Sequence, residues 1–136
     1  MTQLESLNAA AGRAAGVVNG ATASVCALLV GAVDASYEVL MNVLVTTSTT
    51  HTFTCECAYT SEDNQARVIT MPFRLVGDTT ALTSSIAAAA AVPYHGVPLQ
   101  IRCKAATTIT LRTQAGGTYT AVTYNVEGWI QKMSNW

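Results

Sequence analysis

The sequence predicts an all-β protein, an antiparallel β-sandwich or jelly roll preceded by an Ala/Gly-rich N-terminal arm with at most one short helix. Three observations support this prediction. Apolar and polar residues alternate with a period of two from residue 37 onward, Thr and Val are frequent there, and short polar or glycine-containing turns separate the alternating segments. The length of 136 residues suits one domain. We expect an arm over residues 1–34 and a β-sandwich over residues 35–136.

The N-terminal arm combines apolar residues at nearly helical spacing with glycines that oppose a helix. The apolar positions are Leu4, Leu7, Ala11, Ala14 and Val18. Their spacing predicts one short amphipathic helix, but each glycine in such a segment costs about 1 kcal/mol relative to Ala. An arm of this kind is marginal alone, so we expect it to be mobile and to become ordered by packing on a partner.

The clearest strands follow directly after the arm. Residues 37–45 carry apolar side chains on both faces, which predicts a strand covered on both sides, in a sandwich or at a subunit contact. Residues 53–59 alternate strictly and predict a half-buried strand. The polar turn at residues 61–64 and a returning strand at 67–73 complete a β-hairpin, which Pro72 ends or confines to a sheet edge.

The C-terminal half predicts three further strands and one undecided segment. Alternation indicates strands near residues 99–103 and 108–113, and a last strand at about 118–132. Residues 86–92 contain a run of alanines that fits either a short helix or a packed loop.

Composition excludes several classes of protein. Charged residues make up 11% of the chain and the net charge is −1, so a nucleic-acid groove that works by counterion release is not expected. The least polar stretch, residues 14–33, is Ala-rich and interrupted by polar residues, which argues against a membrane span. The N-terminus lacks the pattern of a secretory signal. Low charge gives little repulsion between copies, so we expect subunit partners.

The sequence offers no recognisable catalytic, cofactor or metal motif. His51 and His95 have no orienting partner nearby in the sequence, and the spacings of a nucleophile elbow or a phosphate-binding loop are absent. Cys55 and Cys57 are spaced too closely for a typical zinc site, so we expect them to be buried thiols. We therefore expect no enzyme activity, no cofactor and no metal.

The candidate functional residues are interface residues. Leu4 and Leu7 are placed on the arm as anchors on a neighbouring subunit or another protein. Five further candidates for subunit or partner contacts are Tyr94, His95, Arg102, Lys104 and Trp136. Arg102 and Lys104, together with Arg112, fit either a solvated outer face or a basic patch that pairs with an acidic partner surface.

Three segments of the chain resemble small virion proteins of tailed bacteriophages. They are residues 94–102 (Tyr-His-Gly-Val-Pro-Leu-Gln-Ile-Arg), 106–110 (Ala-Thr-Thr-Ile-Thr) and 122–128 (Val-Thr-Tyr-Asn-Val-Glu-Gly). The hairpin at residues 53–73 fits the same pattern, and the resemblance extends over roughly residues 35–133, leaving the arm unmatched. It implies a jelly roll similar to the trimeric tumour-necrosis-factor-like heads, with no catalytic residues. Such modules decorate capsids or form the tips of fibres.

The resemblance and the composition together lead to one expected function and one alternative. The expected function is that of a homotrimeric capsid decoration (cement) protein that binds the major capsid protein on the exterior of a phage head, after assembly in the host cytoplasm. A short chain with an arm and no fibre shaft fits a decoration protein better than a complete fibre. Many weak contacts on a capsid lattice would add up through avidity. The alternative is a fibre-tip or tail-associated module that binds a host-surface receptor.

Overall fold

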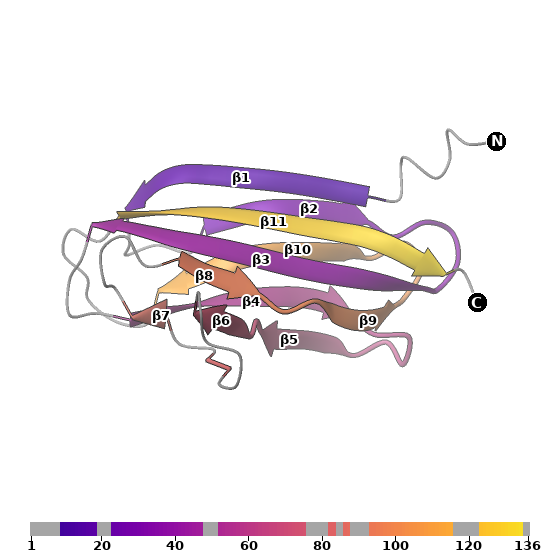
Figure 1. Cartoon of the computed structure of the whole chain (residues 1–136). Helices are drawn as coiled ribbons and strands as arrows, with labels where there is room; N and C mark the ends of the chain where they lie inside the picture. Colours follow the sequence, from indigo (N-terminus) through magenta and orange to yellow (C-terminus); the bar gives the residue numbers. More distant parts are fainter. Residues whose placement is uncertain are drawn as a thin grey trace.

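Two antiparallel sheets packed face to face form a β-sandwich (Figure 1). The computed structural model describes residues 9–18, 23–47, 52–75, 82–83, 86–87, 93–115 and 123–134. None of these described residues is helical. The predicted all-β sandwich is therefore confirmed, and the part of the chain in the structure contains no helix able to cross a membrane.

The first sheet, called sheet A, has β3 near its centre. Its strand order is β1 (Ala9–Val18), β11 (Thr123–Ser134), β3 (Ala35–Thr47), β8 (Pro93–Gly96) and β6 (Phe73–Leu75). The first half of β3 pairs instead with β9 (Leu99–Cys103). β8 and β9 therefore both pair with the same edge of β3, and Pro98 lies between them in the sequence.

The second sheet, called sheet B, covers the inner face of sheet A. Its strand order is β2 (Ala23–Leu29), β10 (Thr108–Ala115), β4 (Thr52–Thr60) and β5 (Ala66–Thr70), with β7 (Ile86–Ala87) paired to the start of β4. Residues 86–87 are therefore extended, and the helix considered for residues 86–92 is wrong at these two positions.

The core lies between the sheets and is built from alternate residues. On β3 the inward residues are Tyr37, Val39, Met41, Val43 and Val45, and all of them are buried. Sheet B contributes the buried side chains of Cys55, Cys57, Ile109 and Leu111 from β4 and β10. The strands predicted at residues 37–45 and 53–59 are thus confirmed. On the outer side of β3, Leu40 and Asn42 are half-buried and Leu44 is 40% exposed.

Residues 9–18 and 23–29 belong to the sheets, which corrects the arm and the helix predicted for these positions. Strand β1 pairs with β11 over the register Ala9 to Gln131 through Val18 to Thr123, and β2 pairs with β10. Burial along β1 alternates with a period of two, from exposed Ala9 to half-buried Ala14. The small residues are the reason, because they let β1 lie close to β2. Leu4 and Leu7 lie outside the described residues.

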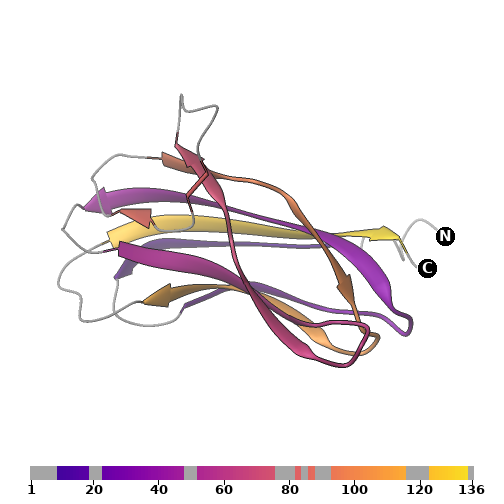
Figure 2. The ribbon, with the colours of Figure 1, turned by 90° about the horizontal axis from the view of Figure 1, so that it is seen from below.

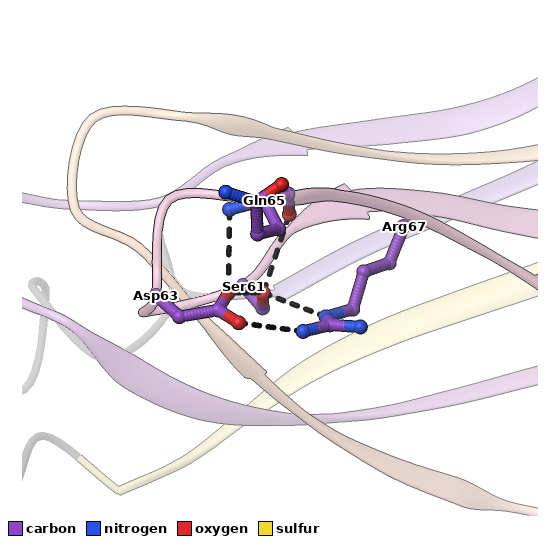
Figure 3. A network of polar contacts seen from close by, with 4 residues as sticks. All are labelled: Ser61, Asp63, Gln65 and Arg67. Atoms are coloured by element: carbon purple, nitrogen blue, oxygen red, sulfur yellow. Dashed lines mark hydrogen bonds and ion pairs between the residues drawn. The ribbon is translucent and has the colours of Figure 1, made fainter.

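The β4–β5 hairpin is closed by a polar network (Figure 3). Asn64 N–H donates to the Ser61 carbonyl at 2.8 Å, and Asn64 has a φ of 65°, which Asn tolerates better than most residues. Arg67 donates to the Asp63 carboxylate at 2.5 Å and to the Ser61 hydroxyl at 2.8 Å. The Ser61 hydroxyl in turn donates to the Asp63 carboxylate, and this bond is the largest cause of the lowered pKa of Asp63, ahead of Arg67 and the Gln65 N–H. The predicted hairpin is confirmed.

The chain passes from sheet B to sheet A at Pro72 (Figure 2). β5 ends at Thr70 and β6 begins at Phe73 in the opposite sheet. Because proline cannot donate a ladder hydrogen bond, it suits a point where pairing changes. Met71 N–H still bonds to the Cys55 carbonyl at 2.8 Å, just before the crossing. The prediction that Pro72 ends its strand is confirmed. The single returning strand predicted at residues 67–73 is instead two strands, β5 and β6, in different sheets.

Gly12→Ala is expected to destabilise the fold through a clash between β1 and β2. A Cβ at position 12 would lie 2.0 Å from the Val25 carbonyl oxygen, which is backbone and cannot move aside alone. Overpacking of this kind costs about 1–3 kcal/mol. Gly31→Ala is the matched control, because a Cβ there has open space around it. Urea denaturation should show a lower midpoint for Gly12→Ala and little change for Gly31→Ala; equal midpoints contradict the prediction.

Ala106→Gly is expected to stabilise the protein. Ala106 has a φ of 61° in the turn between β9 and β10, where its N–H bonds to the Gly31 carbonyl at 2.9 Å. The left-handed conformation costs a residue with a Cβ about 1 kcal/mol or more, and glycine avoids that cost. Ala105→Gly, at the neighbouring turn position without a positive φ, should instead lower stability by about 0.4–1 kcal/mol. Thermal unfolding of both variants checks this, and a lower melting temperature for Ala106→Gly would contradict it.

Candidate functional site

A shallow cleft lies on the outer face of sheet A, away from sheet B. Its volume is about 180 Å³. Nine residues line it: Arg13, Asn42, Val43, Leu44, Pro93, Tyr94, His95, Asn125 and Glu127. They come from four adjacent strands, β1, β11, β3 and β8 (Figure 1). We call this feature the sheet A cleft.

Strand register places the polar residues of the cleft in neighbouring rows. Arg13 on β1 is the register partner of Glu127 on β11, and Glu127 is the partner of Asn42 on β3. The next row joins Asn125 to Leu44. Adjacent strands lie about 4.8 Å apart, and residues two apart along a strand are separated by roughly 7 Å. The side chains are therefore close enough to contact one small molecule together.

The side of the cleft formed by β8 is fixed by Asn42 and Gly96. The Gly96 N–H donates to Asn42 Oδ1 at 2.8 Å, which holds the amide in one orientation. A Cβ on Gly96 would lie 1.9 Å from the Met41 carbonyl oxygen, so only glycine permits this approach of β8 to β3. The Nδ2 group of Asn42 has no hydrogen-bond partner among the described residues.

Opposite charges face the cleft without being paired. The side chains of Arg13, Glu127 and His95 are exposed. Within the described parts of the chain, none of the three forms an ion pair or a side-chain hydrogen bond. The cleft thus presents a guanidinium, a carboxylate and an imidazole to solvent, beside apolar surface from Leu44 and Pro93.

An apolar row lies beside the cleft on the same outer face. Trp129 is the register partner of Ala11 on β1 and of Leu40 on β3. Trp129 is 37% exposed, and Met133, further along β11, is 49% exposed. These residues make the outer face of sheet A partly apolar, and Trp and Met are residue types enriched in contact surfaces between proteins.

Of the predicted interface residues, Tyr94 and His95 adjoin the cleft in different ways. Tyr94 is buried and packs edge-on against Phe73 with ring centroids 6.4 Å apart, so it is mainly a core residue. His95 follows it on β8 and faces outward because side chains alternate along a strand. Trp136 lies outside the described residues.

The structure does not bring the three basic residues into one patch. Arg102 lies on β9 in sheet A, where its Nε donates to Glu62 at 2.7 Å. Arg112 lies on β10 in sheet B and bonds to Glu56 at 3.0 Å. The proposed basic patch is therefore wrong for this pair, because successive strands belong to opposite sheets. Lys104 follows β9, and its N–H bonds to the Thr60 carbonyl at 3.0 Å.

Sequence reasoning missed most of the residues that form the cleft. Arg13, Asn42, Asn125 and Glu127 are absent from the predicted set, although Arg13 and Asn42 are each polar within an otherwise apolar stretch. That contrast is the only signal the sequence offers. It does not say that β1, β11 and β3 are neighbours, because these strands are far apart in the chain.

The cysteines are free thiols near the core. Cys55, Cys57 and Cys103 are buried, and Cys26 is half-buried. Burial raises the pKa of Cys57 and Cys103 to about 12 and that of Cys26 to about 11. Burial also raises the pKa of Cys55. Among the residues in the structure, no cluster of three or more His, Cys, Asp or Glu side chains could hold a metal ion, and His51 lies outside them.

The comparisons with known proteins give no relative. No family model, curated protein or solved structure matches this chain.

The thiols of the folded protein are expected to react slowly with a disulfide reagent such as DTNB at pH 8. The thiolate is the reactive form, and burial keeps these groups protonated. Urea should release all four cysteines at the rate of a free thiol. Rapid labelling of Cys57 or Cys103 without denaturant, located by mass spectrometry, would contradict this.

The same pKa shifts predict a loss of stability at alkaline pH. An unfolded thiol ionises near pH 9, whereas folded Cys57 ionises near pH 12. The folded state therefore binds more protons than the unfolded state between these values, and the free energy of unfolding falls as pH rises through them. Denaturation curves at pH 8 and pH 10.5 measure the effect. Cys57→Ser introduces a polar group into the core, so Cys57→Ala is the better variant for assigning the change.

Proposed function

We propose that this chain is a structural virion protein, a capsid decoration (cement) protein that binds the outside of a bacteriophage head and stabilises it. The observation that carries the proposal is the strand order. When the short strands β6 and β7 are left aside and β8 and β9 are counted as one strand, the sheets read β1-β11-β3-β8 and β2-β10-β4-β5. Apart from the β4–β5 hairpin within sheet B, consecutive strands then lie in opposite sheets, and two four-stranded sheets in this order are the arrangement of a jelly roll. This supports the resemblance of residues 94–102, 106–110 and 122–128 to small phage virion proteins.

The outer face of sheet A supports a role in assembly. Trp129 and Met133, in the apolar row beside the cleft, are both partly exposed on this face. The chain has a net charge of only −1, so copies repel one another weakly. A homotrimer that contacts the major capsid protein uses such a face either between subunits or against the capsid. Repeated weak contacts on a lattice then stabilise the head through avidity.

The proposal predicts saturable binding to undecorated heads of the phage that carries this chain. Purified protein should sediment with these heads and raise the temperature at which they release DNA. Light scattering after size exclusion should give three times the chain mass of 14.2 kDa. Failure to co-sediment overturns the capsid role, whereas a monomeric mass overturns only the trimer.

The surface used for assembly can be located by two matched variants. Trp129→Lys places a charge on the apolar outer face of sheet A and should abolish trimer formation or head binding. Val68→Lys is the control, because Val68 is 55% exposed on β5 in sheet B. Equal head binding and equal mass for the two variants would place the assembly surface elsewhere and remove the support that sheet A gives.

A further inference from the structure

We propose that the sheet A cleft binds a single neutral saccharide ring through Arg13, Asn42 and Glu127. The proposal concerns a small ligand on one surface of the molecule, and it does not rest on the capsid role.

The size of the cleft fits one sugar ring. Its volume is about 180 Å³, below the range of about 300–1,000 Å³ typical of sites for drug-sized ligands. At roughly 30 Å³ per molecule it has room for about six waters. A ring that carries several hydroxyls can replace such a water cluster and reproduce its hydrogen bonds.

The charges of the cleft favour a neutral ligand. Arg13 and Glu127 are register partners on adjacent strands, and both line the cleft. Glu127 repels an anion that approaches Arg13, and Arg13 repels a cation that approaches Glu127. A hydroxyl is both a donor and an acceptor, so neighbouring hydroxyls of a sugar can accept from the guanidinium and donate to the carboxylate. Hydrogen bonds to charged groups are stronger than those between neutral groups.

The orientation of Asn42 adds a donor between the charges and β8. Its Oδ1 accepts from Gly96 N–H at 2.8 Å, so its Nδ2 hydrogens are the part of the amide that remains for a ligand. The amide needs no reorganisation on binding, which lowers the entropic cost. Leu44 and Pro93 supply apolar surface for the C–H groups of a sugar ring. Donors, an acceptor and apolar surface thus meet in one cleft.

Saturation-transfer NMR on the full chain tests the assignment. The probes are the methyl α-glycosides of glucose, galactose and mannose, and N-acetylglucosamine, with glycine as a zwitterionic competitor class. At least one sugar should bind saturably with a dissociation constant on the order of 1 mM, as expected for a few hydrogen bonds in a shallow site. It should shift the ¹⁵N–¹H signals of Arg13, Asn42 and Glu127.

Two variants and one control decide whether binding occurs in the cleft. Glu127→Gln keeps the shape and removes the charge, and it should weaken binding about tenfold. Glu38→Gln makes the same change on β3, opposite Gln131 and outside the cleft lining, and should bind like the wild type. Leu44→Trp enlarges a side chain that is 40% exposed and should block the cleft even if Glu127→Gln fails to fold.

Three results overturn the proposal. The first is no saturable signal from any of the four sugars. The second is binding of glycine alone, which assigns the cleft to zwitterions. The third is sugar binding that both Glu127→Gln and Leu44→Trp leave unchanged, which places the saccharide elsewhere on the protein.

Discussion

The burial of one continuous face of β3 is the contact on which the rest of the structure depends. Tyr37, Val39, Met41, Val43 and Val45 all pack inward against sheet B. Because side chains alternate strictly, this burial also determines which residues face outward. A slip of one residue would bring the polar amide of Asn42 into the core and expose the apolar set. The register that buries this face therefore also directs Asn42 outward, where it lines the cleft.

The fold was predictable where the alternation was strong and side chains were large. Residues 37–45 and 53–59 carry bulky apolar groups at every second position, so their strands followed from the sequence. The N-terminal region was misjudged because alanine and glycine give little contrast between faces. Its apolar residues fit a helical period by chance, and the close approach of β1 to β2 decided the structure. Tertiary packing overrides weak local propensity in such segments.

The candidate site was less predictable than the fold, for two physical reasons. Adjacent residues on a strand point to opposite faces of the sheet, so Tyr94 is buried in the core, whereas the His95 side chain lies at the cleft. Residues on successive strands can lie in opposite sheets, which separated Arg102 from Arg112. Arg13 and Glu127 meet only through the pairing of the first strand with the last. Pairing between strands so distant in the chain leaves no local pattern in the sequence.

The position of β11 constrains how this molecule is made. β11 is the last of the described strands in chain order, yet it lies between β1 and β3 inside sheet A. During synthesis β1 and β3 leave the ribosome before β11, and their edges that pair with β11 remain unpaired until β11 has been made. Contacts between segments so far apart in sequence slow folding, and unpaired strand edges invite association with other chains in the meantime. Ribosomal pausing before residue 123 would prolong that interval, so codon usage just ahead of the β11 segment bears directly on the yield of folded protein.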